Sequence, residues 1–299
     1  MSGLLLLGTA CGLINGASDL TTAPDLPDVP EGAPAADAGP PSDATSGSTD
    51  ADTTTDDGGD ASRPCVVPPP VANTSGALSA LRAPGAVVID GQLDEWSCVP
   101  FTRLDRASAG QMFVSGDSGT PADFAMEFAV TYDSDALYVA ARVSGTAPPA
   151  GDAPTAIFKN DSIEIYLDAD GVLTGRAGPN DHQLVVDHAN REERYVVMSP
   201  PASPTAVPVG FASAARTVGG VLSVEARLPG STLGKSSLAA GDKLGFDIAV
   251  NDGDGTGART QAIWYAAPGC TCTVGCCCGA AQDMPFCNTQ RYGSLTLAP

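Results

Sequence analysis

The chain has 299 residues, and 43% of them are apolar, which is enough to build the hydrophobic core of one or two domains. Its formal net charge is −20, from 35 acidic residues against 15 lysines and arginines. This charge excludes nucleic acid and anionic membrane surfaces as expected partners, because both would repel the protein. The expected ligands are therefore neutral or cationic, and no apolar run after residue 12 is long enough to span a bilayer.

Residues 1–11, which begin the stretch "MSGLLLLGTACG", resemble the end of a bacterial lipoprotein signal. An apolar run is followed by the small residues Gly8, Thr9 and Ala10 and then by Cys11, the residue that such a signal would lipidate. Gly8 stands where a leucine is usual and no basic stretch comes first, so an apolar start with an incidental cysteine is the alternative. Lipidation at Cys11 implies an exported protein held at the bacterial cell envelope by its lipid anchor, and without it we expect a secreted protein.

Residues 12–74 are predicted to form a disordered acidic tether. Residues 1–64 contain eleven acidic residues and one basic residue, Arg63, so they contribute −10 of the net charge of −20. They contain no aromatic residue, since the first in the chain is Trp96, and they are rich in Pro, Gly, Ser, Thr and Asp. Such a segment cannot bury enough apolar surface to offset the conformational entropy of the chain.

Residues 75–299 read as a series of short strands separated by turns, with no helical periodicity longer than a turn or two. This pattern predicts an all-β fold, an antiparallel β-sandwich whose topology is either jelly-roll or immunoglobulin-like. The clearest element is a hairpin over residues 131–143, in which "DSD" at 133–135 supplies the turn. After the turn, four apolar side chains are expected on one face: Leu137, Val139, Ala141 and Val143.

The stretch "AIFKNDSIEIYLDAD" at 156–170 predicts a strand with one face buried. Three apolar residues alternate with three that would face outward: Ile163, Ile165 and Leu167 against Ser162, Glu164 and Tyr166. Asp161 and Glu164 could form the carboxylate pair that a glycosidase needs. A strand-opening Asp161 that accepts hydrogen bonds from loop amides, and a Glu164 on the polar face, explain the pair better. Since no "GxSxG" stretch is present either, we expect no enzyme activity.

Nine cysteines occur along the chain: Cys11, Cys65, Cys98, Cys270, Cys272, Cys276, Cys277, Cys278 and Cys287. If Cys11 is lipidated, the remaining eight can form four disulfides in an oxidising compartment, and a thiolate metal cluster at "CTCTVGCCC" is the alternative. A Cys-rich loop at 268–287 needs such bonds, because a structureless loop of this length is rare in a compact domain. Adjacent cysteines rarely pair, so Cys276, Cys277 and Cys278 are expected to bond outward, with Cys65 and Cys98 among the candidates.

Two acidic loops, "DADG" at 168–171 and "NDGDG" at 251–255, offer oxygen atoms for structural calcium and also read as ordinary Asp-Gly turns. The residues concerned are Asp168, Asp170, Asp252 and Asp254. His182 and His188 are six residues apart near one strand, so they would lie about 20 Å apart and cannot share a metal by themselves. No metal or cofactor is assigned beyond that calcium.

Six blocks together resemble the family 9 carbohydrate-binding modules, which are β-sandwich modules of DOMON-like architecture. In order, the blocks are "VIDGQLDEWSCVPF", "VTYDSDALYVAARVSG", "FKNDSIEIYLDADG", "VEARLPGSTLG", "LGFDIAVNDGDG" and "RYGSLTL". The resemblance covers about residues 85–299, and its specificity lies in the ordered series. It implies non-catalytic binding of xylan-type or cellulose-type polysaccharide, or of chain ends, in support of a glycoside hydrolase partner. It also favours the calcium interpretation, and it places Trp96 in the core. Trp264 is expected in the core because it lies within the predicted strand "QAIWYAA".

The resemblance further implies a sugar site in which two aromatic rings clasp the ligand. Phe158 and Phe286 stand at those two positions, where tryptophan is usual, and we expect them to face each other across an open cleft with Glu164 on its floor. Gln183 and Asp187 are the other candidate ligand-binding residues. Val185 and Asp187 replace the Arg and Asn of the relatives, so a different ligand preference and a low affinity are expected.

Three alternatives remain open from the sequence. Phe158 could instead cover the rim of the sandwich while Phe286 caps the cysteine cluster. The domain could bind haem as part of a redox protein, with Met126, Met198 and the two histidines as the only axial ligand candidates. It could also be a degenerate module that serves as a structural or protein-interaction domain.

Overall fold

The computed structural model of the chain describes residues 65–115, 125–145, 153, 155–174, 180–195, 204–253, 259–267 and 288–299. Four 3₁₀ turns occur in these ranges: η1 (Asp94–Cys98), η2 (Ile157–Lys159), η3 (Gly230–Leu233) and η5 (Thr289–Arg291). The strands are β1 (Val71–Ala72), β2 (Ala77–Arg82), β3 (Thr102–Asp105), β4 (Gln111–Ser115), β5 (Ala125–Tyr132), β6 (Ala136–Ser144), β7 (Ser162–Asp168), β8 (His182–Asp187), β9 (Glu192–Tyr195), β10 (Ala212–Val218), β11 (Val221–Pro229), β12 (Lys243–Gly253), β13 (Arg259–Ile263) and β14 (Gly293–Leu297). Within these ranges, no helix has the length and apolar character needed to cross a bilayer.

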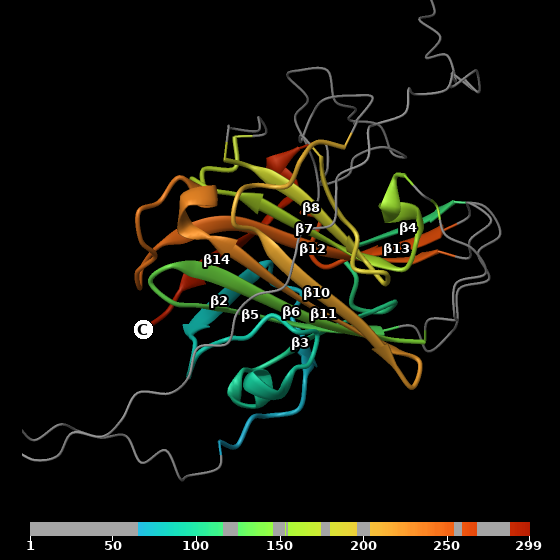
Figure 1. Ribbon diagram of the computed structural model, residues 1–299, viewed down its shortest axis with the longest axis horizontal. Helices are drawn as coiled ribbons and strands as arrows, with labels where there is room; N and C mark the ends of the chain where they lie inside the picture. The colour runs from blue at the N-terminus through green and yellow to red at the C-terminus, as the bar shows by residue number, and fades with distance from the viewer. Residues whose placement is uncertain are drawn as a thin grey trace, which may run out of the picture. The chain divides into compact units, whose positions relative to one another are not determined.

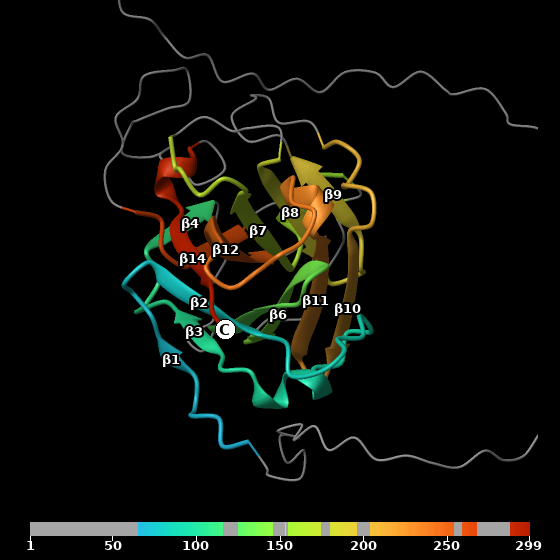
Figure 2. The same ribbon diagram turned by 90° about the vertical axis from the view of Figure 1, so that its left-hand side faces the viewer.

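The strands form two sheets that meet at β2 (Figures 1 and 2). The first sheet runs β10-β11-β6-β5, with β3 and β1 beyond β5, and the second runs β14-β12-β7-β8-β9, with β13 and β4 continuing from β12. Strand β2 pairs in parallel with β5 of the first sheet and β14 of the second. The predicted all-β sandwich is confirmed, and most of its pairs are antiparallel as expected. The parallel pairs of β2, and that of β1 with β3, are departures from the expected antiparallel pattern.

The predicted hairpin at 131–143 is present as β5 and β6. The carboxylate of Asp133 accepts hydrogen bonds from the backbone N–H groups of Asp135 and Ala136, at 2.7 and 2.8 Å, which closes the turn. All four predicted apolar residues of β6 are buried in one hydrophobic cluster. Asp is suited to this position because its short side chain can bond to backbone N–H groups two and three residues ahead.

The main core lies between the two sheets. The first sheet contributes residues of β5, β6 and β11, such as Phe128, Val139 and Val224, and the second contributes residues of β7, β8 and β12, such as Ile165 and Phe246. Trp264, just after β13, packs edge-on against Phe128 with ring centroids 5.7 Å apart. Its indole N–H donates to the carbonyl of Asn73 at 2.6 Å. Trp264 therefore belongs to the core, as expected.

A second apolar cluster covers the outer face of the first sheet. Trp96, carried by η1, packs there with Val99, Tyr138 and neighbouring apolar side chains. Its indole N–H donates to the carboxylate of Glu225 at 2.8 Å. The same carboxylate accepts from the backbone N–H groups of Asp90 and Gly91, which fixes the chain ahead of η1. The core placement of Trp96 is also confirmed, and burial raises the pKa of Glu225.

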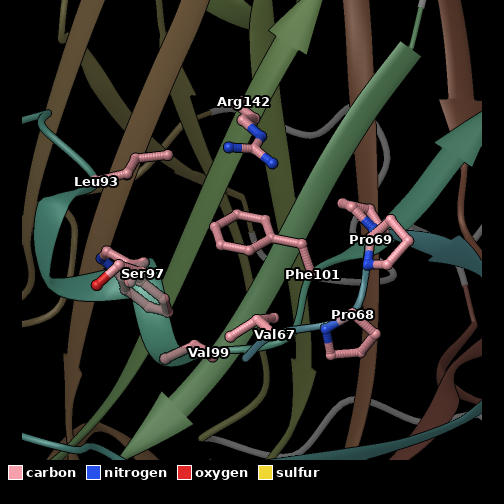
Figure 3. A pocket seen from close by; sticks show the side chains of 10 residues that line it. Val67, Pro68, Pro69, Leu93, Ser97, Val99, Phe101 and Arg142 are labelled. Atoms are coloured by element: carbon pink, nitrogen blue, oxygen red, sulfur yellow. The ribbon is translucent and has the colours of Figure 1, made fainter. Parts of the chain in front are cut away.

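The described chain begins with a proline-rich segment that is attached to the first sheet. Cys65 forms a disulfide with Cys98, and β1 pairs with β3, so the folded domain extends upstream of the predicted boundary at residue 75. Residues 67–70 line a cavity of about 250 Å³ beside Phe101 and Arg142, whose guanidinium lies 4.8 Å from the Phe101 ring centroid (Figure 3).

The disulfide between Cys65 and Cys98 corrects one expectation. Because these two cysteines bond to each other, neither is available to Cys276, Cys277 or Cys278. All the cysteines of the loop at 268–287, together with Cys11, lie outside the described residues. Their pairing and the lipidation of Cys11 stay predictions.

Candidate functional site

Strand β7 is buried on both faces, so the predicted half-buried strand is wrong. Ile163, Ile165 and Leu167 lie in the main core as expected. The residues expected to face solvent, including Glu164 and Tyr166, are also buried. The reason is that polar side chains from neighbouring strands meet on this second face and satisfy one another there, while Tyr292 packs beside Tyr166 with ring centroids 5.8 Å apart.

Glu164 is the centre of this buried polar network. Its Oε1 accepts hydrogen bonds from the side-chain amides of Asn251 and Gln261, both at 2.8 Å. Its Oε2 accepts from the amide of Gln183 at 2.8 Å and from the Tyr166 hydroxyl at 2.5 Å. The carboxylate is 1% exposed, and these four donors, all neutral, come from β12, β13, β8 and β7. A carboxylate with two oxygens has about four acceptor positions, so this set of donors uses its full capacity.

Three members of the network were missed by sequence reasoning: Tyr166, Asn251 and Gln261. Asn251 and Gln261 lie opposite each other in the β12–β13 ladder, and Glu164 lies opposite Ala249 on β12. Side chains two residues apart on a strand point to the same face, so Tyr166 shares a face with Glu164, and Asn251 shares one with Ala249. This alternation is visible in the sequence of each strand. The pairing of the strands, which brings them together, could not be read from that alternation.

Phe158 lies in the turn η2, directly before β7, and is half-buried. Its ring packs edge-on against Tyr195 of β9, with centroids 5.6 Å apart and an interplanar angle of 69°. The backbone N–H of Ile157 donates to Glu193 Oε2 at 3.1 Å, and the Tyr195 hydroxyl donates to the same oxygen. The expected partial exposure of Phe158 is present. Phe286 lies outside the described residues, so the sugar clasp between the two rings stays a prediction.

Asp187 has a different role from the ligand contact expected of it. It is fully buried, and its Oδ2 accepts hydrogen bonds from Asn160 Nδ2 at 3.1 Å and from Arg191 Nε at 2.8 Å. The same oxygen forms an ion pair with Arg191 Nη2 at 2.6 Å. Its Oδ1 accepts from the backbone N–H groups of Ala189 and Arg191. These contacts hold the turn after β8 against the residue that ends η2. Asp187 therefore fixes the geometry of these two segments.

Asp161 serves the structural purpose that its place before a strand predicts. Its Oδ1 accepts a hydrogen bond from the backbone N–H of Gly253 at 2.9 Å. The glycine is needed there, because a Cβ on Gly253 would lie 2.1 Å from the carbonyl oxygen of Lys159. Asp161 thus connects the end of β12 to the segment between η2 and β7, which follows Phe158 in the chain.

Two of the residues considered as haem ligands, Met126 and His182, are placed for packing. Met126 is completely buried in the main core. His182 is also buried, with Nδ1 accepting from Arg194 Nε at 3.0 Å and Nε2 lying 3.0 Å from the carbonyl of Thr232, to which it must donate. Burial lowers the pKa of His182, which matches a neutral ring with both nitrogens engaged. Met198 lies outside the described residues.

Two buried carboxyl groups on the second sheet have raised pKa values. Burial raises the pKa of Asp247 to about 7, against the opposing effect of backbone N–H donors led by Ala266. Burial, a hydrogen bond with Asp170 and the charge of Asp181 raise the pKa of Asp168 to about 6. Within the ranges that the structure describes, no group of three or more His, Cys, Asp or Glu is arranged to hold a metal, and Asp254 lies outside them. Calcium stays a hypothesis.

The raised pKa values of Asp247 and Asp168 predict that the free energy of unfolding increases as pH falls from 8 to 6. The lowered pKa of His182 acts in the opposite direction below about pH 6.5, because the unfolded chain then binds a proton that the buried ring does not. An unfolded Asp titrates near 3.9, so the folded protein binds protons more tightly over this range. For Asp247 alone, a pKa of about 7 gives roughly 1 kcal/mol of added stability between pH 8 and pH 6. Below pH 4 the trend reverses, because hydrogen bonds from Ser108 and Arg103 lower the pKa of Asp105, and protonation removes that contribution.

Urea unfolding at pH 8, 6 and 5 measures this dependence. Asp247→Asn should flatten the profile between pH 8 and pH 6, because the titrating group is gone. Parallel profiles for wild type and Asp247→Asn between pH 8 and pH 6 would contradict the raised pKa of Asp247.

Comparison with known proteins gives one family. The carbohydrate family 9 binding domain-like family matches residues 89–299. The chain is 27% identical to endo-1,4-beta-xylanase A of Thermotoga maritima over 194 residues, which are 64% of this chain and 16% of that protein. It is also 27% identical to exoglucanase XynX of Acetivibrio thermocellus over 185 residues, 62% of this chain and 15% of that protein. The chain therefore spans about a sixth of the length of these relatives.

Solved structures show the same fold. A family 9 carbohydrate binding module from Caldicellulosiruptor kristjanssonii, in complex with cellotriose, matches with a TM-score of 0.52 and 21% identity, covering 74% of this chain and 93% of that one. A family 9 carbohydrate binding module from the same organism, in complex with glucose, matches with a TM-score of 0.52 and 21% identity, covering 74% of this chain and 95% of that one.

Proposed function

The chain belongs to the carbohydrate family 9 binding domain-like family, and on this premise we propose that its folded domain is a non-catalytic module that binds xylan-type or cellulose-type polysaccharide, or the ends of its chains. One observation carries the proposal. A half-exposed aromatic ring, Phe158, lies in a turn that contacts β7, β8 and β12, the strands that carry Glu164 and two of its amide donors. A partly exposed aromatic face held on rigid strands offers a neutral pyranose a surface on which to stack.

Glu164 supports binding by orienting its neighbours. Because its carboxylate already receives four hydrogen bonds, it holds the amide groups of Gln183, Asn251 and Gln261 in fixed directions. The side chains of Gln183, Asn251 and Gln261 are themselves buried, at 6%, 0% and 0% exposure. The direct contact to sugar is therefore assigned to Phe158, and the network is assigned the role of keeping the strands around that ring rigid.

The neutral donor set bears on affinity and ligand choice. Val185 is a buried neutral residue packed with Ile157 and Tyr195, where a guanidinium would supply several donors. With fewer charged donors, an uncharged sugar is favoured and weak binding is expected. The cellotriose and glucose held by the Caldicellulosiruptor modules, and the xylanase and exoglucanase relatives, support glucan or xylan ligands.

The wider setting of the module is also proposed. An exported protein, lipidated at Cys11 and extended by the acidic segment 12–74, would hold this domain at the bacterial cell envelope near polysaccharide and near a glycoside hydrolase partner. The composition of residues 1–64 and the signal-like start support this arrangement. Palmitate labelling of the expressed full chain, with Cys11→Ser as the control, tests the anchor.

We expect Phe158→Ala to weaken retention on polysaccharide by about twofold to tenfold, because an aromatic contact of this kind contributes roughly 0.5 to 1.5 kcal/mol. Pull-down of the full chain on insoluble xylan and cellulose, with competition by soluble reducing sugars, measures the effect. Phe101→Ala is the matched control, since Phe101 is a half-buried ring on the outer face of the other sheet.

Two results would count against the proposal. Equal retention of wild type and Phe158→Ala would remove Phe158 from the site. A wild-type protein that is retained on none of these polysaccharides, and that no soluble sugar stabilises, would favour a module kept for structural or protein-interaction purposes.

A further inference from the structure

We propose that Tyr195 and Glu193, on the edge strand β9, are positioning residues that set the orientation of the Phe158 ring. This inference rests on the proposed function, because it concerns how the ring is presented to sugar. Neither residue stands out in the sequence, where both lie in the polar stretch "REERYVV". The structure brings them against the turn that carries Phe158.

The turn η2 needs support from outside itself. It has three residues, Ile157–Lys159, and no side-chain cap at its start. The residue before it, Ala156, has a φ of 57°, a left-handed conformation that side chains other than glycine rarely adopt. So short a 3₁₀ turn has too few hydrogen bonds to hold this conformation by itself. Tertiary contacts must therefore decide where Phe158 points.

Glu193 holds the start of the turn and the neighbouring ring with one oxygen. Its Oε2 accepts the backbone N–H of Ile157 at 3.1 Å, at the first position of η2. The same Oε2 accepts the hydroxyl of Tyr195. Hydrogen bonds to an ionised acceptor are stronger and more directional than neutral ones. The start of η2 and the Tyr195 side chain are therefore both hydrogen-bonded to Glu193 Oε2.

Tyr195 supplies the surface on which Phe158 lies. Its side chain is 1% exposed and packs with Ile157 and Val185 in a small separate apolar cluster. Phe158 lies edge-on to it, at 5.6 Å and 69°, which is a preferred geometry for two aromatic rings. This contact leaves Phe158 half-exposed while its partner is buried.

The edge strand also connects the ring to the polar network. In the β8–β9 ladder, Tyr195 lies opposite Gln183, and Glu193 lies opposite Val185. Gln183 donates to Glu164, so Tyr195 lies one ladder position from the nearest amide of the polar network. A shift of Tyr195 or Glu193 would therefore change the direction in which the Phe158 ring faces, and that direction decides which face of a sugar can stack on it.

A reporter on the ring itself tests the inference. In a Phe158→Trp background of the full chain, the fluorescence of the introduced tryptophan can be followed against Trp96 and Trp264, which are buried at 2% and 1% exposure. Acrylamide quenching and anisotropy report how firmly the ring is held. Tyr195→Leu removes the aromatic ring that Phe158 packs against, Tyr195→Phe removes only the hydroxyl, and Glu193→Ala removes the shared hydrogen-bond acceptor. Glu192→Ala, an adjacent carboxylate bonded to Ser213, is the matched control.

We expect Tyr195→Leu and Glu193→Ala to raise the quenching constant of the introduced tryptophan about twofold and to weaken binding of cello-oligosaccharide about fivefold to tenfold. Tyr195→Phe should have a smaller effect of the same sign, and Glu193→Gln, which keeps an acceptor oxygen, should partly rescue Glu193→Ala. Glu192→Ala should change neither quantity. Thermal unfolding of each variant shows whether the domain stays folded.

The outcomes separate this inference from the proposed function. If the parent binds sugar and the Tyr195 and Glu193 variants change neither quenching nor affinity, the positioning role is wrong. Weaker binding with unchanged quenching also overturns it, since the ring is then not what moved. Increased quenching in a protein that binds no sugar supports the positioning of the ring while contradicting the carbohydrate function.

Discussion

Replacing Glu164 with alanine is expected to lower the free energy of unfolding by about 3 to 5 kcal/mol. The substitution removes the acceptor of four hydrogen bonds and leaves the donors of Gln183, Asn251, Gln261 and Tyr166 facing each other in a buried space. Each unsatisfied buried donor costs on the order of 1 to 3 kcal/mol, and entry of water offsets part of the sum. Glu164→Gln should cost less, about 1 to 3 kcal/mol, because its carbonyl oxygen still accepts while its NH₂ opposes two donors.

Chemical denaturation of both variants measures this prediction. Glu127→Ala is the control, because Glu127 is a partly exposed carboxylate on the other sheet that pairs with Arg142 and Arg103. Ion pairs of that kind contribute below about 1 kcal/mol. A loss under about 1 kcal/mol for Glu164→Ala would show that the network is not the buried, satisfied arrangement described above. A binding assay on Glu164→Ala alone is uninformative for the same reason, since it would mix lost contacts with partial unfolding.

Removing the disulfide between Cys65 and Cys98 is expected to lower the free energy of unfolding by about 2 to 4 kcal/mol. The two cysteines are 33 residues apart, so the bond restricts a long loop of the unfolded chain. In the folded state this loop contains Trp96 and the segment that bonds to Glu225. The short strand β1, with two residues, is too small to replace the bond.

Thermal unfolding of Cys65→Ser/Cys98→Ser against wild type, each with and without reductant, tests this. Wild type should lose stability on reduction, and the double variant should begin lower and lose less. Any loss of stability that the double variant still shows on reduction is attributed to disulfides formed by the other cysteines. Equal melting temperatures for the oxidised wild type and the variant would show that the bond does not form or does not constrain the chain.

The parts of the fold that can be predicted from sequence are the ones encoded by neighbouring residues. The β5–β6 hairpin follows from alternating apolar residues and from an Asp133 whose bonds reach only two and three residues ahead. The apolar face of β7 follows from the same alternation. Trp96 is assigned to the core by resemblance and Trp264 by its place in a predicted strand, and their indole N–H groups have partners 129 and 191 residues away.

The parts that cannot be predicted from sequence depend on pairing between distant segments. Alternation assigns Glu164 to solvent, because a polar residue on a strand usually faces outward. Its amide donors Asn251 and Gln261 are 87 and 97 residues away in the chain, so only the ladder register brings them to it. The packing of the Phe158 ring against Tyr195 depends likewise on the register with which the edge strand β9 pairs with β8. Eight cysteines allow 105 pairings, so the partner of Cys65 has to come from the structure.

The position of β2 has a consequence for how the protein is made. Among the described strands, β2 joins the two sheets, and its partner in the second sheet is β14, which is made more than 200 residues later. A nascent chain in which β14 has not yet emerged from the ribosome cannot close its sandwich, so the edge of its core stays open. Pairing over this separation also makes closure slow relative to local folding. A chain cut short before β14 is therefore expected to be recognised by proteases, while a chain that includes β14 closes and resists them.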